Sequence, residues 1–223
     1  MTCKNCTRTG VPGQTIRFKG DYPYIRCADC GELIPLFTSS LSVSDRKWDT
    51  YFHSICIAVS SKSPCLSRKI GAILVKDHSI ISTGFNGPSQ GIPHCGHERM
   101  MRDNSLIAET LNWASTRLNP VPHPDQWRKE CPRRLLNFGS GTGMQWCSAQ
   151  HAEANVISNA ARLGVSVFGA TLYMNCVTPC KNCYGTLINA GIVEIVVDDL
   201  KLYDEHTQYL IDNSTIKIRS FHN

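Results

Sequence analysis

The sequence lacks a long apolar segment and a strongly charged one. No apolar run approaches the ~20 residues of a membrane span, and residues 1–6 lack the apolar core of a signal peptide. Charged residues make up only 18%, the net charge is +5, and no stretch forms a polybasic arm, so charge alone does not indicate polymer binding. We therefore expect a soluble, cytoplasmic protein with no membrane partner.

Cysteine, by contrast, is abundant, with twelve residues in 223. Disulfides are rare in reducing compartments, so this many cysteines in an intracellular chain indicate metal ligation. The spacing supports this interpretation, because six of them form Cys-x-x-Cys pairs. These pairs are Cys3/Cys6, Cys27/Cys30 and Cys180/Cys183.

The first two pairs predict a zinc-ribbon-like extension over residues 1–33, followed by a linker over 34–44. A segment of this length cannot build a sufficient apolar core, and a metal would replace one. Cys3, Cys6, Cys27 and Cys30 are the expected tetrahedral thiolate ligands. Such a ribbon leaves nucleic-acid binding open, alongside a structural role or an oligomer contact.

Residues 45–223 predict a catalytic domain of the α/β class. Its second half alternates helices and strands, which favours parallel strand pairing. We expect helices at 44–60, 97–117, 151–163, 180–190 and 203–212, and strands at 70–75, 80–85, 170–175, 193–197 and 214–219.

One connection in this domain is unusually long and is predicted to be a functional insertion, at about 98–146. It is basic at 128–129 and 133–134, and its glycine-rich run at 138–143 could close over a ligand. A solvated basic face is the simpler interpretation of these charges, and a lone glycine-rich run is weak evidence for phosphate binding.

The most informative residues are His151 and the pair Cys180/Cys183. One histidine and two cysteines form a three-ligand zinc set, which leaves a fourth position open, as in catalytic rather than structural sites. Both segments are predicted to begin helices. The positive ends of these helices would favour thiolate over thiol at the metal.

Glu153 lies two residues after His151, where its carboxylate can sit beside a metal-activated water without binding the metal. The order His-x-Glu followed by Pro-Cys-x-x-Cys is the signature of zinc deaminases. The alternative is a core histidine at 151 and half of a structural site at Cys180/Cys183. That alternative leaves Glu153 and Pro179 unexplained.

Several further stretches carry a resemblance over residues 46–219. These stretches are 67–75, 81–88, 91–95, 151–164 and 189–192. Together with the metal motif they resemble the deoxycytidylate (dCMP) deaminase family of the zinc-dependent cytidine deaminase superfamily. The resemblance implies a three-layer sandwich with a central mixed five-stranded sheet.

The resemblance also implies the chemistry, a hydrolase reaction that converts dCMP to dUMP and ammonia. His151, Cys180 and Cys183 would hold the catalytic Zn²⁺, and Glu153 would be the proton shuttle. Asn86 would contact the sugar, and the Ala152 backbone would help to hold the pyrimidine.

Further cysteines match positions where relatives bind a second, structural zinc. Cys65, Cys95 and Cys147 are three such ligands by resemblance. Cys131 is the candidate fourth, with His94 and His97 as rivals, so three zinc ions per chain are expected when the ribbon is counted. Cys56 and Cys176 are interpreted as buried thiols.

Relatives of this kind form homo-oligomers, hexamers among them, and respond to dCTP and dTTP. Arg162 lies on the catalytic helix where subunit contacts occur in them, which makes it a candidate oligomer or effector residue. A homo-oligomer is therefore expected, with regulation as an open question.

Two departures from the family pattern concern the pocket. Val197 stands where relatives usually carry a tyrosine, and the approach to Pro179 is one residue longer, which predicts a bulge.

Competing hypotheses are deamination of dCTP, 5-modified dCMP, adenine or guanine nucleotides or a polynucleotide. A third hypothesis is a catalytically quiet nucleic-acid-binding module, which would have no need of Glu153.

Overall fold

The computed structural model describes residues 17–19, 22–26, 33–35, 43–116, 123–202 and 204–221. The chain divides into two compact units, residues 1–43 and 44–223. In the first, β1 (Arg17–Lys19), β2 (Tyr22–Arg26) and β3 (Leu33–Pro35) pair antiparallel in that order. The four cysteines of the predicted ribbon lie outside the described residues, so its zinc site stays a prediction.

The second unit is built on a mixed five-stranded sheet with the order β10-β9-β8-β4-β5. β8 pairs parallel with β9 and β9 with β10, whereas β4 runs antiparallel to both β5 and β8. The predicted fold class and the parallel pairing of the second half are therefore confirmed. The strands are β4 (Gly71–Lys76), β5 (Ser79–Phe85), β8 (Thr171–Val177), β9 (Glu194–Asp199) and β10 (Lys217–Ser220).

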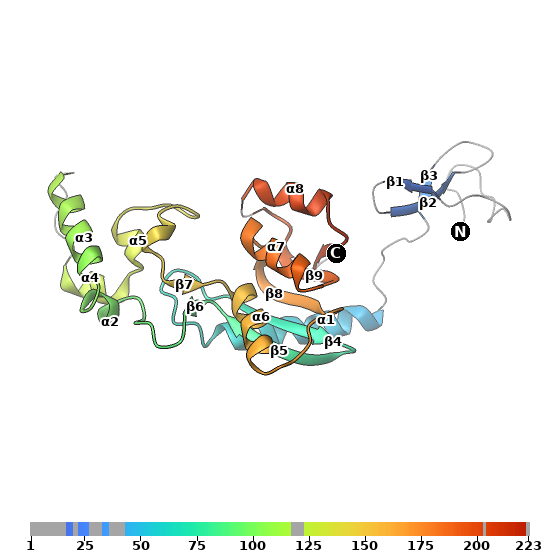
Figure 1. Cartoon of the computed structure of the whole chain (residues 1–223), viewed down its shortest axis with the longest axis horizontal. Coiled ribbons are helices and arrows are strands. Elements are labelled where there is room, and N and C mark those ends of the chain that lie inside the picture. Colours follow the sequence, from blue (N-terminus) through green and yellow to red (C-terminus); the bar gives the residue numbers. More distant parts are fainter. Residues whose placement is uncertain are drawn as a thin grey trace. The chain divides into compact units, whose positions relative to one another are not determined.

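Helices cover both faces of this sheet and complete three layers (Figure 1). α1 (Val43–Ser60) packs Phe52 and Cys56 against Ile73 and Val196 on one face. The opposite face carries alternate side chains of the same strands, because successive residues of a strand point to opposite sides. There α6 (Ala152–Arg162) and α7 (Lys181–Asn189) pack against the sheet, and α8 (His206–Asp212) contacts α7.

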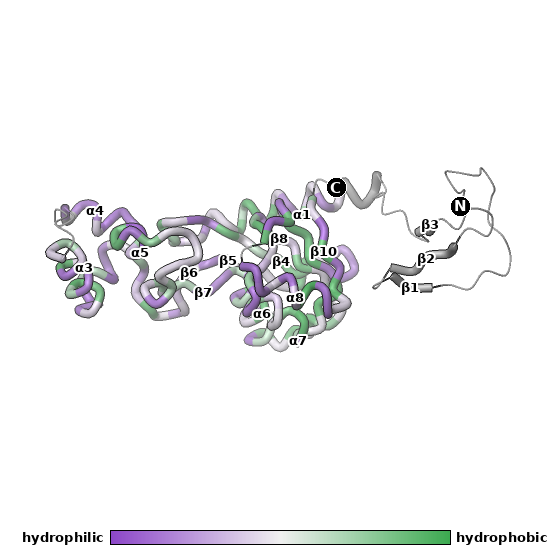
Figure 2. Tube along the Cα trace, turned by 90° about the horizontal axis from the view of Figure 1, so that it is seen from above, coloured by the Kyte–Doolittle hydropathy of each residue, from purple (hydrophilic) through white to green (hydrophobic). Residues whose placement is uncertain are grey.

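Figure 2 shows hydrophobic stretches gathered around this central sheet. They include Leu74, Leu172 and Ile195, which are fully buried with Val156 of α6 and Leu187 of α7. Within the described ranges, every helix is too short or too polar to span a bilayer.

The insertion is more broken than the sequence predicts. The single helix expected at 97–117 is two helices, α2 (His97–Met100) and α3 (Asn104–Thr116). Asp103 causes the break, because its carboxylate accepts a hydrogen bond from the Leu106 amide at 2.9 Å and pairs with Arg99 at 2.9 Å. Three short helices follow, α4 (Pro124–Lys129), α5 (Pro132–Leu135) and the 3₁₀ turn η1 (Met144–Trp146).

A close approach fixes α6 on β5. A Cβ added to Gly84 would overlap the Val156 amide nitrogen and lie 2.9 Å from the Ala152 carbonyl oxygen. The same contact is held by side-chain hydrogen bonds, from Asn155 to the Phe85 carbonyl at 2.7 Å and from Asn159 to that of Thr83 at 2.8 Å. Only glycine allows the helix to pack this close to the strand.

We expect Gly84→Ala to lower the free energy of unfolding by about 1–3 kcal/mol, because the methyl group must push α6 away from β5. Thermal or urea denaturation measures this change. Gly185→Ala is the matched control, since its Cβ would meet nothing closer than Leu210 Cδ1 at 4.0 Å and alanine favours a helix interior. Equal stability of both variants would contradict the packing argument.

Candidate active site

Two helix N-termini converge at the predicted metal-ligand residues. His151 is the N-cap of α6 and Cys180 is the N-cap of α7, as the sequence predicts. A short ribbon of β6 (Gly87–Pro88) and β7 (Ala149–Gln150) leads the chain into His151. The free amide groups at both helix starts place partial positive charge beside the thiols.

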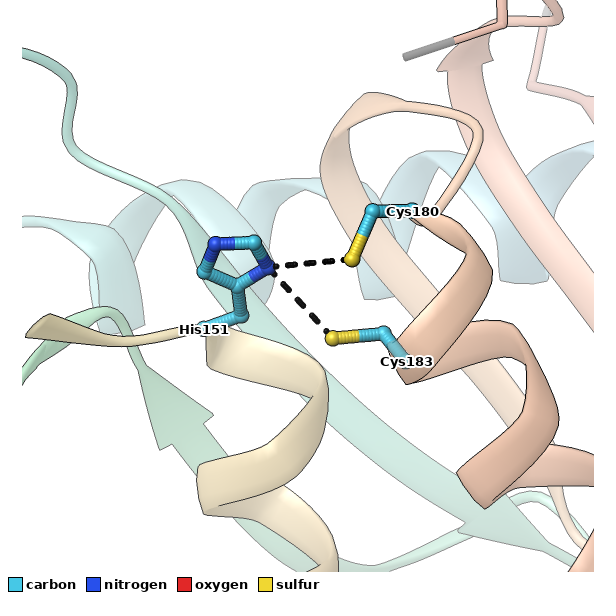
Figure 3. Close-up of side chains that lie close together, drawn as sticks. All are labelled: His151, Cys180 and Cys183. Carbon is cyan, nitrogen blue, oxygen red and sulfur yellow. Dashed lines mark hydrogen bonds between the residues drawn. The ribbon is translucent and has the colours of Figure 1, made fainter. Parts of the chain in front are cut away.

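The three ligand side chains face one another (Figure 3). His151 Nδ1 lies 3.5 Å from Cys180 Sγ and 3.4 Å from Cys183 Sγ. Tetrahedral zinc, with bonds of about 2.0–2.1 Å to nitrogen and 2.3 Å to sulfur, would separate these atoms by about 3.6 Å. The residues therefore fit Zn²⁺, and all three ligand atoms lie within 4.8 Å of one another.

The protonation of the thiols also suits a metal. A hydrogen bond from the Cys183 thiol, together with His151, lowers the pKa of Cys180 to about 4, although burial opposes the change. The same shared hydrogen bond raises the pKa of Cys183. The pair thus holds one thiolate readily, and a bound cation would replace the second proton.

Glu153 lies in the first turn of α6 and is 4% exposed. Burial raises the pKa of its carboxyl group, and the nearby His151 opposes the rise. A buried carboxyl group beside a metal site is poised to take up a proton and to release it within one reaction cycle.

A comparison of the chain with known protein families agrees with this geometry. The model of the cytidine and deoxycytidylate deaminase zinc-binding region matches residues 46–198. The chain belongs to this deaminase family.

Individual relatives agree with the family. The deoxycytidylate deaminase of Enterobacteria phage T4 is 33% identical in an alignment of 158 positions, which covers 64% of this chain and 72% of the phage protein. That of Mycobacterium phage D29 is 30% identical over 67% of this chain and 92% of its own length. That of Saccharomyces cerevisiae is 26% identical over 85% of this chain. The chain spans 53% of the Saccharomyces enzyme and 44% of its Schizosaccharomyces pombe counterpart.

Among solved structures, the dCMP deaminase of cyanophage S-TIM5 in complex with dCMP and dUMP shares the fold. It aligns with a TM-score of 0.51 and 18% identity, over 78% of this chain and 96% of the phage chain.

A cavity of about 300 Å³ opens in front of the candidate metal ligands, a volume within the range of small-molecule sites. One end is lined by His151, Ala152, Glu153 and Cys180. The opposite wall comes from the insertion, including Phe138 and the residues around it. The long connection singled out in the sequence therefore forms part of the cavity.

Asn86 lines this cavity, but most of its amide is engaged by the wall itself. Its Oδ1 accepts hydrogen bonds from Ser63 Oγ at 2.7 Å and from the Ile70 amide at 2.8 Å, and its Nδ2 donates to the Arg68 carbonyl at 2.9 Å. It thus shapes the loop before β4. A sugar contact of Asn86 stays a prediction.

The four cysteines of the predicted second zinc site, Cys65, Cys95, Cys131 and Cys147, all line the same cavity. Burial raises the pKa of Cys95, and the neighbouring Cys131 adds to the rise. Within the described ranges, however, the only residue group close enough to hold a metal is the His151 set. The two alternative fourth ligands lie in different segments. His94 lies in a loop, His97 begins α2, and both are exposed.

The predicted bulge before Pro179 is present. The register of β8 against β9 shifts between Met174 and Val177, and Cys176 and Val177 line the cavity there. Cys56 is fully buried, as expected, but Cys176 is only partly buried. Val197, in place of a family tyrosine, is fully buried in the core.

Two arginines, one of them from the basic positions 133–134 noted in the sequence, bind backbone carbonyl oxygens of the insertion. Arg99 is 9% exposed, and its guanidinium donates to the Trp146 carbonyl at 2.6 Å while it pairs with Asp103. Arg133 binds the carbonyl oxygens of the glycine-rich loop. The basic charge of the segment was visible in the sequence, but its carbonyl partners were not.

We expect Cys183→Ala to lower the zinc content by one ion per chain, because a set of two ligands binds zinc weakly. Metal analysis by mass spectrometry measures this. Cys176→Ala is the matched control, since Cys176 lines the cavity outside the ligand set. Equal zinc in the two variants would contradict the assignment of the site.

Proposed function

We propose that this chain catalyses the hydrolytic deamination of dCMP to dUMP and ammonia. The observation that carries the proposal is the buried Glu153 beside a three-ligand zinc set at the end of one cavity. Three ligands leave a position for water, as in catalytic zinc sites. The deoxycytidylate deaminases among the relatives support the choice of substrate.

The chain's own residues divide the work. His151, Cys180 and Cys183 hold the Zn²⁺, which when bound supplies an activated water near neutral pH. The cytosine lies with its C4 toward Glu153, and the Ala152 amide at the helix start donates to the ring. Asn86 contacts the sugar through its remaining amide hydrogen.

Glu153 moves protons between the water, the N3 atom of the ring and the departing amine. Its raised pKa suits this work, because the carboxyl group must be both a base and an acid near neutral pH.

Glu153→Gln is expected to lower kcat for dCMP by about 10²–10⁴-fold, while the zinc content stays unchanged. Ammonia release and metal analysis on the same preparation measure both. Glu130→Gln serves as the control, because Glu130 is exposed and does not line the cavity. Undiminished turnover in the Glu153→Gln variant would overturn the assignment of Glu153.

The substrate is tested with a panel of dCMP, dCTP, cytidine, 5-methyl-dCMP, purine nucleotides and single-stranded DNA. Loss of amine is measured by mass. Turnover of dCMP above the others supports the proposal. Turnover of another nucleotide or of the polynucleotide alone supports the competing deaminase hypotheses, and no turnover with zinc bound supports a catalytically quiet module.

Two structural zinc ions complete the proposal. Cys65, Cys95, Cys131 and Cys147 would hold one beside the cavity, where it would brace the entry to α6 through Cys147. Cys3, Cys6, Cys27 and Cys30 would hold the other in a zinc ribbon. The protein works in the cytoplasm, where thiols stay reduced for such ligation.

We expect three zinc ions per chain, two in Cys131→Ala and two in Cys6→Ala. Cys56→Ala is the control, because Cys56 is fully buried against α1 and the sheet. Metal analysis after exhaustive dialysis counts the ions. A single ion in the unmodified chain would refute both structural sites.

The active form is proposed to be a homo-oligomer, with a hexamer as one candidate. Arg162 is the candidate contact residue on α6, because it is exposed in the last turn of this helix. Its guanidinium donates a hydrogen bond to Asn159 Oδ1 on the same helix, at 3.3 Å. Regulation by dCTP and dTTP at Arg162 is a further hypothesis about the same contact.

A further inference from the structure

The two ends of the cavity differ in chemistry. The metal end is formed at α6 and α7, and the other wall by α5 and the loop after it. In both views the β6–β7 ribbon lies between α5 and α6 (Figures 1 and 2). A ligand that reaches both ends must therefore be extended, with one group at Glu153 and another at α5.

The charges at the α5 end are positive. Arg133 and Arg134 both line the cavity there, and Arg68 lines it on the side of the loop before β4. Among the described residues that line the cavity, Glu153 is the only carboxylate. Within this lining, the α5 wall thus carries no acidic side chain to neutralise its two guanidinium groups.

Arg133 fixes the shape of the loop at this end. Its Nε donates to the Thr142 carbonyl at 2.5 Å and its Nη2 to the Gly139 carbonyl at 2.7 Å. Gly143 turns the loop in the left-handed region, with φ 64°, and a Cβ there would overlap the Phe138 ring. Because the carbonyl partners are neutral, the positive charge of Arg133 remains.

Arg134 differs from Arg99 and Arg219 in having no acidic partner within the described part of the chain. Arg99 pairs with Asp103, and Arg219 pairs with Asp49 and Glu194. Arg134 makes no such bond, is exposed, and lies next to the segment that Arg133 immobilises. Its planar guanidinium is therefore available to a ligand.

An arginine of this kind binds phosphate in a bidentate manner. We propose that Arg134 binds the phosphate of the nucleotide substrate, with the adjacent Arg133 adding charge and the Ser140 hydroxyl available as a further donor. The proposal rests on the proposed function, because it requires the base to occupy the metal end. It makes the insertion the part of the chain that selects nucleotides over nucleosides.

Arg134→Ala tests this assignment. We expect KM for dCMP to rise by about 10–100-fold with kcat little changed, the loss typical of a charged hydrogen bond. The kcat/KM for deoxycytidine, which lacks the phosphate, should not change. Binding of dUMP, measured by calorimetry, should weaken by the same factor, and Arg134→Lys should restore part of it as a single point charge.

The matched control is Arg128→Ala, which removes the same charge from an exposed position of the insertion that does not line the cavity. Its KM for dCMP and its dUMP affinity should equal those of the unmodified protein. Equal effects of the two variants would reduce the role of Arg134 to general charge and overturn the proposal.

Three further outcomes separate the proposals. If the unmodified protein turns over dCMP and Arg134→Ala leaves its preference over deoxycytidine intact, the phosphate assignment falls and the proposed function stands. If Arg134→Ala lowers turnover of both compounds equally, the residue supports the fold only, which also overturns the assignment. If dCMP is not turned over at all, the proposed function falls, and dUMP calorimetry still decides whether Arg134 binds phosphate.

Discussion

The convergence of two helix N-termini on one point governs the second unit. His151 and Cys180 cap α6 and α7, and their side chains meet because both helices lie on the same face of the sheet. A metal bound by His151, Cys180 and Cys183 would replace the proton that the two thiols share and would neutralise the charge of the thiolates. The position of α6 depends in turn on Gly84, where the absence of a side chain allows the helix to contact β5.

The buried carboxyl group follows from the same arrangement. Glu153 sits in the first turn of α6, so any packing that fixes His151 also carries Glu153 into the interior. Burying a charge is costly, and the raised pKa of Glu153 reflects that cost, although the nearby His151 opposes it. A cation at the His151 set would lower the cost, which would couple metal binding to the protonation of Glu153.

The insertion lines the cavity without contributing to the main core. It packs around its own small cluster, which includes Met100, Leu106 and Leu136. Two buried or partly buried guanidinium groups, those of Arg99 and Arg133, bind its carbonyl oxygens and give its cavity wall a defined shape. Charge that is engaged by neutral acceptors inside such a wall still acts on the cavity, which suits an anionic ligand.

The sequence by itself determined the fold class, the strand and helix order of the second half, and the candidate metal group of His151, Cys180 and Cys183 with Glu153 in the same helix start. Those features are local or periodic: a buried strand shows as an apolar run, and His-x-Glu and Pro-Cys-x-x-Cys place chemistry within one helical turn. The resemblance to the dCMP deaminase family added the bulge before Pro179, where the register of β8 against β9 shifts.

Only the tertiary structure decided how the insertion is built and that it lines the cavity. The break at Asp103 depends on a side chain capping α3 while it pairs with Arg99, and the sequence shows only a polar residue there. Three other features depend on residues that are distant in the chain. They are the burial of Val197, the hydrogen bonds of the Asn86 amide, and the absence of an acidic partner for Arg134 among the described residues. Local patterns record which groups a residue carries, whereas the partners of those groups are set by packing between elements that the sequence separates.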